Sequence, residues 1–499
     1  WPESVVLASH YTTAEMSVIS DFNQQKTRLD LIQGSSYASV LRPLQLSCYD
    51  NSNNRHVVTV TLLDSMLLAP PDETRSLDKL GSLLGLEKLT LPSEHSKSQM
   101  LRFLEEKPQL FGKYAIRDAE ITARYIRRIQ RECGDLNLFN YLPVTIGGLA
   151  TKVFLRTFDG GPDNRTYDSV MGINQRRVQQ RGFGNRARTY QNERANYHED
   201  VAIKCYHGGR NECFLFGYHD GIWTDYDLEG AYSTALAAYI EPDFSNIQRT
   251  ENLDDFHLDQ MGFALATWKF PKDTRFPCLF QRDKDGHGLI YVLEGEGYLT
   301  SPEIALARRM GAEITIRDGI VVPFVKDGIR PFLHISRWVK EQRDKYPKHT
   351  HAFENAFYKL IGNNVYGKVA QGLKNTSRVF DSRIGSTKRL ERSRISDAYA
   401  AAFTTGIVRA TTSEILSKLP DDVVVGNSIT DGVCTTATEE QMKAATTGPQ
   451  CQFFSQLREM ICGDPKILDI KGKVDGMVFM RTRMHGTIGK LFQGYDPIL

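Results

Sequence analysis

The sequence predicts a protein of several domains that combines the α/β and α+β classes. The chain has 499 residues, more than one hydrophobic core usually organises, so two to four domains are expected. Up to about residue 140, strand-like and helix-like segments alternate, which is typical of an α/β domain. After residue 200, groups of strand-like segments precede long helical runs, which favours an α+β arrangement.

Each element of the first 140 residues has its own pattern. The apolar run at residues 4–11 predicts a buried strand, and residues 12–22 predict a helix after it. Residues 56–68 predict a strand pair or one long strand. Apolar residues three and four positions apart predict helices over residues 76–86 and 114–132.

The second part of the chain opens with a weakly patterned segment. Residues 160–200 are polar and rich in Arg, and we expect a linker or a loop that faces nucleic acid. Strand-like runs then resume at residues 202–218, 221–228 and 262–271. The later elements are expected as two helices separated by a breaker, a further helix and an apolar strand: residues 332–346, 351–370, 396–418 and 422–426.

Composition excludes several classes of protein. Apolar residues make up 41% and charged residues 24%, and no run approaches the roughly 20 apolar residues that span a bilayer, so no membrane role is expected. The eight cysteines form no CxxC pair, which argues against a zinc ribbon or a disulfide framework. This cysteine usage predicts a reduced, cytoplasmic location.

The net charge is only +2, but two segments concentrate positive charge. Local basic patches in a neutral chain suit a polyanion such as nucleic acid, although solvated loops would have the same composition. The basic residues are Arg176, Arg177, Arg181, Arg186, Arg188 and Arg194 in one segment and Lys374, Arg378, Arg383, Lys388, Arg389, Arg392 and Arg394 in the other.

Two aspartates stand at the ends of strand-like runs, Asp227 in TDYDLEGAY and Asp431 in SITDGVCTT. A carboxylate at a strand end is held by a rigid scaffold, and two of them can share Mg²⁺, which completes its shell with substrate phosphates. Two ions about 3.5–4 Å apart would stabilise the attacking and leaving oxygens of phosphoryl transfer. Each aspartate alone would also fit a turn or a helix cap.

A third feature lies on the helix expected at residues 351–370. Lys359, Asn363 and Tyr366 stand at positions i, i+4 and i+7, so they project from one face. A cation can hold a triphosphate and a ring can stack on a base or sugar. The alternative is one charged residue beside a core tyrosine.

Five segments in order resemble the motifs of family B DNA polymerases. Residues 227–235 (DLEGAYSTA) are similar to the first polymerase motif, residues 359–367 (KLIGNNVYG) to the second and residues 428–433 (SITDGV) to the third. Residues 206–212 (YHGGRNE) resemble the Tyr-x-Gly-Gly element of the protein-primed branch. Residues 473–483 (KVDGMVFMRTR) occupy the place of the Lys-x-Tyr motif that touches the primer.

The resemblance implies roles for individual residues. Asp227 and Asp431 would be the catalytic residues and would hold two Mg²⁺ ions together with the Leu228 carbonyl, with Mn²⁺ as a substitute. The residues implied to bind the nucleotide are Tyr232, which would exclude a 2′-hydroxyl, and Arg343, Lys359, Asn363 and Tyr366. Those implied to bind template or primer are Tyr206, Gly208, Gly209, Lys473, Arg481 and Arg483.

The chain departs from the family pattern in two motifs. Ile429 stands where the first Asp of an Asp-Thr-Asp core is usual and Gly432 where a serine is usual, so the third motif keeps a single acid. An Arg-Thr-Arg run at residues 481–483 replaces Lys-x-Tyr. These features resemble the primer-independent polymerases of self-replicating elements integrated in bacteria, which predicts a bacterial, mobile-element or viral origin.

The first domain resembles the 3′–5′ exonuclease of the same family. SHYTTAEMSVI is similar to the second exonuclease motif with Glu15 in place of Asp, and YAIRDAEIT to the third, with Tyr114 and Asp118 on one helical face. The first motif is expected before Trp1, so the sequence leaves open an editing domain or an inactive fold kept as a template channel.

The predicted layout is therefore an exonuclease-like α/β domain followed by a right-hand polymerase of palm, fingers and thumb. We expect a monomeric DNA-templated DNA polymerase that uses template, primer and dNTPs, with a terminal protein allowed but not required. The basic insertion between the second and third motifs would support strand displacement, or would be a solvated loop. The rivals are a decayed polymerase fold that only binds nucleic acid, and a nuclease. The expected segments are residues 1–140 (exonuclease-like), 141–200 (linker), 201–329 (palm), 330–372 (fingers), 373–396 (insertion), 397–450 (palm) and 451–499 (palm end and thumb).

Overall fold

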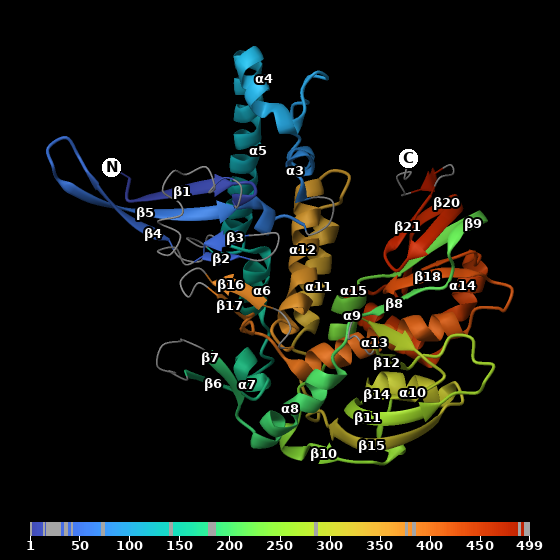
Figure 1. Ribbon diagram of the computed structural model, residues 1–499. Coiled ribbons are helices and arrows are strands. Elements are labelled where there is room, and N and C mark those ends of the chain that lie inside the picture. The colour runs from blue at the N-terminus through green and yellow to red at the C-terminus, as the bar shows by residue number, and fades with distance from the viewer. Residues whose placement is uncertain are drawn as a thin grey trace. The chain divides into compact units, whose positions relative to one another are not determined.

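The computed structural model (Figure 1) divides the chain into two compact units. One unit joins residues 1–156 to residues 341–394, and the other joins residues 157–340 to residues 395–499. None of the helices in the described ranges is long and apolar enough to cross a membrane. The structure describes residues 2–12, 15, 31–33, 38–40, 43–70, 75–138, 143–177, 186–283, 288–374, 378–381, 386–487 and 491–493.

The first unit contains two small sheets. In one, β1 lies parallel to β5, and β4 pairs with the other edge of β5 in an antiparallel register. In the other, β16 pairs with β17 and with β2, so the basic insertion forms a hairpin that extends the sheet of β2 and β3. The strands are β1 (Ser4–Ser9), β2 (Leu31–Gln33), β3 (Ala38–Val40), β4 (Leu44–Tyr49), β5 (Arg55–Asp64), β16 (Arg378–Asp381) and β17 (Ser386–Arg389).

The helix predicted over residues 114–132 is confirmed as part of α5 (Pro108–Asp135). Its buried residues, among them Tyr114, Ile121 and Tyr125, recur at spacings of three and four and make one apolar face. Proline at the first helical position fits the earlier start, because its missing N–H would be unpaired there anyway. Most of the helix expected over residues 12–22 lies outside the described residues. Among the described residues, three other long helices lie wholly or partly in this unit: α6 (Ile146–Thr157), α11 (Leu333–Lys345) and α12 (Ala352–Val369).

The second unit is built on a seven-stranded sheet in the order β21-β20-β9-β19-β18-β8, with β22 paired to β20. Helix α13 (Ala398–Ser417) packs on α8, α9, α10 and α15, and it is buried along nearly its whole length because Ala, Gly and Thr let neighbours approach closely. The sheet strands are β8 (Arg210–Cys213), β9 (Gly217–Leu228), β18 (Val425–Thr430), β19 (Gly432–Thr435), β20 (Leu468–Arg481), β21 (Met484–Gly486) and β22 (Leu491–Gln493). The helices are α8 (Glu193–Cys205), α9 (Ala231–Leu236), α10 (Ser301–Arg309), α14 (Glu439–Ala445) and α15 (Pro449–Cys462).

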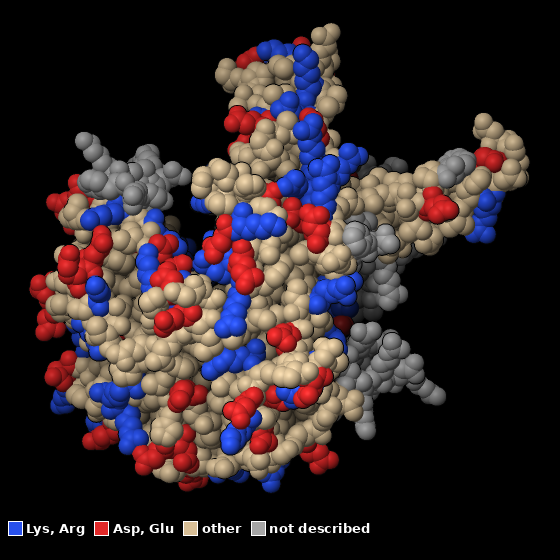
Figure 2. All heavy atoms as spheres, turned by 180° about the vertical axis from the view of Figure 1, so that it is seen from behind, with Lys and Arg blue, Asp and Glu red and all other residues tan. Residues whose placement is uncertain are grey.

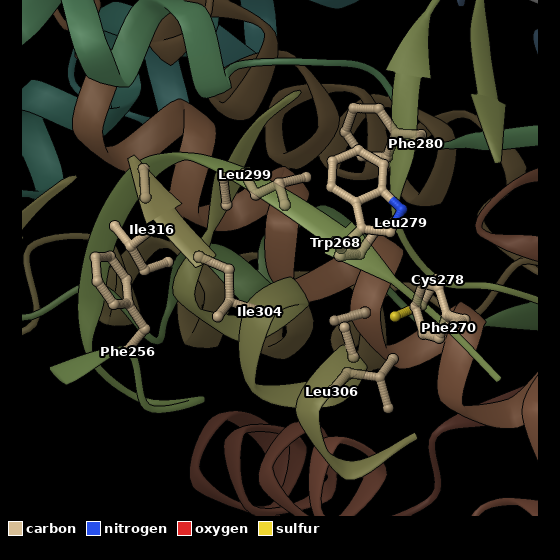
Figure 3. Packing of buried hydrophobic residues seen from close by; sticks show 14 of the residues in the cluster. Phe256, Trp268, Phe270, Cys278, Leu279, Phe280, Leu299, Ile304, Leu306 and Ile316 are labelled. Atoms are coloured by element: carbon tan, nitrogen blue, oxygen red, sulfur yellow. The ribbon is translucent and has the colours of Figure 1, made fainter. Parts of the chain in front are cut away.

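A second, four-stranded sheet supports α10 and α13 through the apolar cluster of Figure 3. Ala264, Ala266 and Trp268 alternate along β11 and enter this cluster from one face of the strand. Gly295 leaves room for the indole of Trp268, because a Cβ there would lie 2.9 Å from its Cζ2 atom. The sheet consists of β10 (Gln248–Arg249), β11 (Met261–Lys269), β14 (Glu294–Thr300) and β15 (Glu313–Val322).

The segment expected as a linker, residues 160–200, is structured wherever it is described. It contains α7 (Tyr167–Val170), β6 (Ile173–Arg177) paired with β7 (Arg186–Tyr190), and most of α8. The strand expected from residue 202 is also wrong at its start, since α8 continues to Cys205. The buried face of α8 consists of Ala195, Glu199, Ala202 and Cys205, and these small or polar residues give a weak hydrophobic signal in the sequence.

The basic segments are only partly described, because the side chains of residues 175–189 and 375–385 are outside the described set. Arg194 donates to the backbone oxygens of Ser245 and Ile247, and Arg389 donates to the Gly372 carbonyl. These two cations therefore make contacts within the chain. On the face seen in Figure 2, Lys and Arg are interspersed with Asp and Glu, in keeping with the small net charge.

Candidate active site

Strand pairing brings the two predicted aspartates together in the second unit. β9 and β19 are antiparallel, and Asp227 lies opposite Gly432, the residue after Asp431. The turn between β18 and β19 needs a left-handed residue, Thr430, with φ of 63°. The Leu228 N–H donates to the Asp431 carbonyl at 3.0 Å, so the first and third motifs are fixed to each other by their backbones.

Both burial and charge oppose ionisation of one carboxyl group of the site. Burial and the nearby charge of Asp227 raise the pKa of the Asp431 carboxyl to about 7. The Lys471 ammonium lies 3.7 Å from Oδ2 of Asp227 and 2.9 Å from Oδ2 of Asp469. Asp469 lies opposite Asp227 in the β20–β9 register, so β20 adds a cation and a third acid to the site.

Sequence reasoning missed Lys471 and Asp469. The primer-binding motif was placed at residues 473–483, two residues further along β20. The available signal was DIKGK, in which two lysines alternate on a strand, but the register with β9 shifts between Ile470 and Gly472, and only the ion pair shows that Lys471 reaches Asp227. Hydrogen bonds with its own backbone and with the Thr438 side chain lower the pKa of Glu440 on α14, and the charge of Lys473 lowers it further.

Tyr232 also joins this site. Gly230 adopts a left-handed conformation at φ of 59° and starts α9, which carries the half-buried Tyr232. Burial and then the charge of Asp431 raise the pKa of the Tyr232 hydroxyl. The ring is therefore within electrostatic range of the aspartate pair, where the resemblance implies a sugar contact.

The two glycines of the Tyr206–Gly209 element have different surroundings. A Cβ on Gly209 would lie 2.4 Å from the Thr430 carbonyl oxygen, whereas a Cβ on Gly208 would meet no atom within 4 Å among the described residues. Gly209 is thus required for packing against the third motif. Gly208 is the one with open space beside it, which suits the predicted contact with a template strand.

The arginines predicted to contact the primer lie at the end of β20. Arg481 is its last residue and Arg483 follows in a left-handed turn with φ of 62°. The Arg483 Nε lies 3.4 Å from Oδ1 of Asn211, whose partner across β8 and β18 is Ile429. Arg483 therefore reaches β8, the strand that pairs with the third-motif strand β18, and both arginines are exposed.

The predicted nucleotide-binding residues on α12 belong to the first unit. Lys359 and Asn363 are exposed and Tyr366 is half-buried, which confirms that they share one face of the helix. The opposite face packs through Phe357, Ile361 and other apolar residues. Arg343 on α11 has a buried Nε, and its carbonyl accepts from the side-chain amide of Asn355 at 3.2 Å.

A second candidate site lies within the first unit, around the predicted exonuclease residues. Tyr114 and Asp118 line a pocket of about 710 Å³ that also includes Glu15, His10 and Lys88. Lys88 donates to Asp118 at 2.7 Å and lies 5.0 Å from the centroid of the Tyr114 ring. Burial opposes the charge of Lys88, but the hydrogen bond to Asp118 raises its pKa overall. Sequence reasoning did not select Lys88, which precedes the motif by 26 residues and carries no local pattern.

Metal binding at either site would need oxygens beyond the side chains. In the part of the chain that the structure describes, no group of three or more His, Cys, Asp or Glu side chains is placed to hold an ion alone. The aspartate pair still suits Mg²⁺, which takes one or two carboxylates, water and substrate phosphates. The Lys471 ammonium beside Asp227 marks where a positive charge is already favoured.

Two acids carried by paired strands suit metal-assisted phosphoryl transfer, and a comparison with family models shows to which family the chain belongs. The model of DNA polymerase type B, organellar and viral, matches residues 111–409, and the chain belongs to this family. The chain is similar to the primer-independent DNA polymerase PolB of Escherichia coli, with 33% identity over 517 residues. That match covers 97% of this chain and 58% of the length of the E. coli protein.

Solved structures of phi29 DNA polymerase share the fold. The complex with primer-template DNA matches with a TM-score of 0.57 and 13% identity over 94% of this chain and 75% of the phi29 chain. The complex that also contains incoming nucleotides matches with a TM-score of 0.55 and 14% identity, over 91% and 73% of the two chains. At this identity the likeness establishes a mixed α/β fold of the family B type.

Proposed function

We propose that this protein is a DNA-templated DNA polymerase whose catalytic residues are Asp227 and Asp431. The observation that carries the proposal is the pairing of β9 with β19, in which Asp227 lies opposite Gly432 and the Leu228 N–H donates to the Asp431 carbonyl. Membership of the type B polymerase family supports the same reaction. A fold kept only for binding nucleic acid would have no need for a buried acid, Asp431, whose pKa is raised by burial and by a second acid nearby.

The residues of the site divide the chemistry among them. Asp227, Asp431 and the Leu228 carbonyl would hold two Mg²⁺ ions, which when bound activate the primer 3′-hydroxyl and neutralise the departing pyrophosphate. Tyr232 packs under the sugar and excludes a 2′-hydroxyl. Lys471, held by Asp469, places a positive charge beside the primer end.

The remaining residues position the substrates. Gly208 and Tyr206 face the template, and Lys473, Arg481 and Arg483 bind primer phosphates. Lys359 with Arg343 grips the triphosphate, and Asn363 and Tyr366 line the nascent base pair.

We further propose that synthesis starts without a primer or a terminal protein. A similar E. coli protein is named for primer-independent synthesis, and exposed Arg481 and Arg483 supply two cations where the primer motif usually supplies one. These cations would grip the triphosphate of the first nucleotide and offset its lost freedom of motion. Primer-free circular single-stranded DNA with a γ-labelled nucleotide tests this: label at the 5′ ends of products supports it, and no product beside robust primed extension rules it out.

The pocket around Tyr114, Asp118 and Lys88 supports a second proposed activity, 3′–5′ editing. Tyr114 would orient the attacking water, and Asp118 and Glu15 would take part in holding metal. This pocket supports the proposal of an exonuclease-like domain ahead of the palm, the fingers and the start of a thumb. The rival use of this domain as an inactive template channel predicts no shortening of a 3′ end.

A primed template with Mg²⁺ separates these functions in one reaction. With dNTPs, the polymerase predicts extension that is lost in Asp431→Asn, while a binding protein predicts no change. Without dNTPs, an editing site predicts shortening that is lost in Asp118→Asn. Retention of full extension in Asp431→Asn would refute the assignment of the third motif.

A further inference from the structure

Two fully buried arginines hold the backbone next to the third motif. Arg409 of α13 has its Nε 2.7 Å from Oε1 of Glu303, and its Nη1 donates to the carbonyls of His207 and Gly208 at 3.0 and 2.9 Å. Arg409 is 0% exposed and Glu303 is 1% exposed. Replacing such a pair by apolar residues is often neutral or stabilising, so stability alone is a weak reason to keep it.

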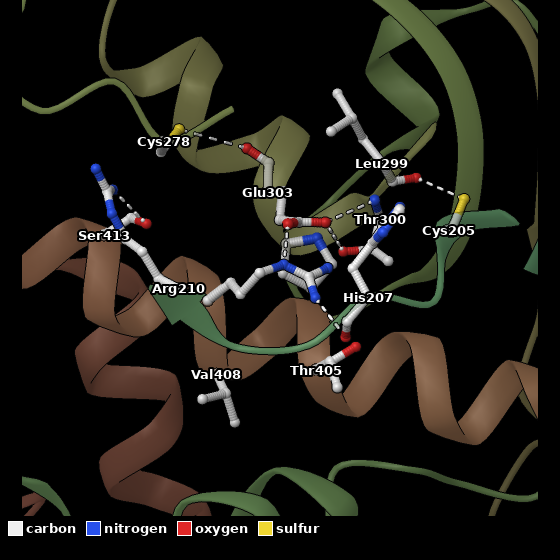
Figure 4. A network of polar contacts seen from close by, with 12 residues as sticks. Cys205, His207, Arg210, Cys278, Leu299, Thr300, Glu303, Thr405, Val408 and Ser413 are labelled. Carbon is white, nitrogen blue, oxygen red and sulfur yellow. Dashed lines mark hydrogen bonds and ion pairs between the residues drawn. The ribbon is translucent and has the colours of Figure 1, made fainter. Parts of the chain in front are cut away.

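Glu303 is itself fixed by the start of α10. Its Oε2 accepts from the backbone N–H of Thr300 at 3.0 Å and from the Thr300 hydroxyl at 2.7 Å. Figure 4 shows this cap beside the loop that carries His207. The carboxylate therefore cannot follow Arg409 if the loop moves, and the ion pair acts as a rigid support.

A second arginine ties the other end of the same loop to the same helix. Arg210 is 0% exposed, lies 4.0 Å from the centroid of the Tyr291 ring and donates to the Ser413 hydroxyl of α13 at 2.9 Å. Its Nε also donates to Glu212 at 2.6 Å. Residues 207–210 are thus held to α13 at both ends (Figure 4).

The loop of residues 207–210 packs closely against the third motif. A Cβ at Gly209 would come within 2.7 Å of the Thr430 Cα, and Arg210 is the register partner of Thr430. Thr430 precedes Asp431, whose carbonyl is bound to the Leu228 N–H. A shift of the loop must therefore move Asp431 relative to Asp227, because interiors are packed too densely to absorb it.

We propose that Arg409 and Glu303 are positioning residues that set the separation of the two catalytic aspartates through the Tyr206–Gly209 element. This inference rests on the proposed polymerase function. The pair touches neither substrate nor metal. Its role is to keep the template loop and the metal ligands in one arrangement. A merely structural ion pair would affect folding and nothing else.

The test uses the purified protein and the variants Arg409→Met, Glu303→Gln and the double variant. Thermal stability and the Mg²⁺ concentration that gives half-maximal primer extension are measured for each. Each single variant leaves an uncompensated buried group and is expected to lower Tm. The double variant removes both buried charges and should recover Tm to near the wild-type value. Its half-maximal Mg²⁺ concentration should stay at least about tenfold higher than that of the wild-type protein, because the loop has lost the Arg409 donors.

Arg165→Met is the matched control. Arg165 forms a two-pronged pair with the buried Glu241 at 2.6 and 2.7 Å, and these bonds involve no residue of the Tyr206–Gly209 element. It should lower Tm without changing the Mg²⁺ requirement. The proposal is overturned if the double variant recovers both Tm and the wild-type Mg²⁺ requirement. If the wild-type protein extends no primer, the proposed function has failed instead. If a single variant does not fold, the double variant still tests the proposal.

Discussion

Gly209→Ala should damage catalysis through the backbone of the third motif. The added Cβ would lie 2.4 Å from the Thr430 oxygen, and real Cβ atoms essentially never come closer than 3.0 Å. The loop and Thr430 must therefore separate by about 0.6 Å or more. Overpacking of this kind costs about 1–3 kcal/mol of stability. A misplacement approaching 1 Å costs up to about 100-fold in rate, and we expect a fall in kcat of about 10- to 100-fold.

The assay compares Gly209→Ala with Gly208→Ala at saturating primed template. A Cβ on Gly208 meets no described atom within 4 Å, so that variant should keep the wild-type Tm, and any effect should appear in the KM for DNA. The kcat of Gly209→Ala should fall while its affinity for dNTP in the presence of Ca²⁺ changes little. Equal kcat values for the two variants would refute the account of Gly209 as a packing residue of the third motif.

Three further predictions concern single side chains. Tyr232→Ala should admit ribonucleotides, because the half-buried ring beside Asp431 would no longer occupy the space under C2′; an unchanged ratio of dNTP to rNTP incorporation in single-turnover extension would contradict this. Asp431→Asn should raise the Tm of the metal-free protein at pH 8 while abolishing synthesis, since burial and Asp227 oppose the charge of Asp431; a lower Tm in calorimetry would show that the repulsion is absent. Lys88→Met should slow the shortening of a 3′ end and leave extension by the palm unchanged, because Lys88 contacts Asp118 and Tyr114, which belong to the first unit. Equal shortening rates of wild type and variant on a labelled primer would exclude a role for Lys88 in editing.

The sequence predicted those parts of the fold that carry a strong period or a spaced motif. α5, α11, α12 and α13 follow runs of apolar or small residues at helical spacing, and β9 and β18 end at the predicted aspartates. The exposed face of α12 also follows from spacing alone, since positions i, i+4 and i+7 share one side. The family motifs added the pairing of Asp227 with Asp431, which the β9–β19 register confirms.

Features that depend on strand register and on buried polar contacts were not predictable. Lys471 and Lys473 look alike in the sequence, and an irregularity of the β20–β9 register between Ile470 and Gly472 sets Lys471 apart, with its ammonium 3.7 Å from Asp227. The inner face of α8 is made of small or polar residues, so that face shows no large apolar residues at helical spacing. Arg409 and Glu303 are separated by 106 residues, and a buried ion pair between distant segments has no local signature.

Metal binding at the aspartate pair tests the central claim most directly. The protein is mixed with a chain-terminated primer on template, the next correct dNTP and Mn²⁺, and bound Mn²⁺ is counted by electron paramagnetic resonance. The account predicts two bound ions at the palm for the wild-type protein and fewer for both Asp227→Asn and Asp431→Asn, with DNA binding retained. Two palm ions in either variant, together with wild-type primer extension, would contradict it.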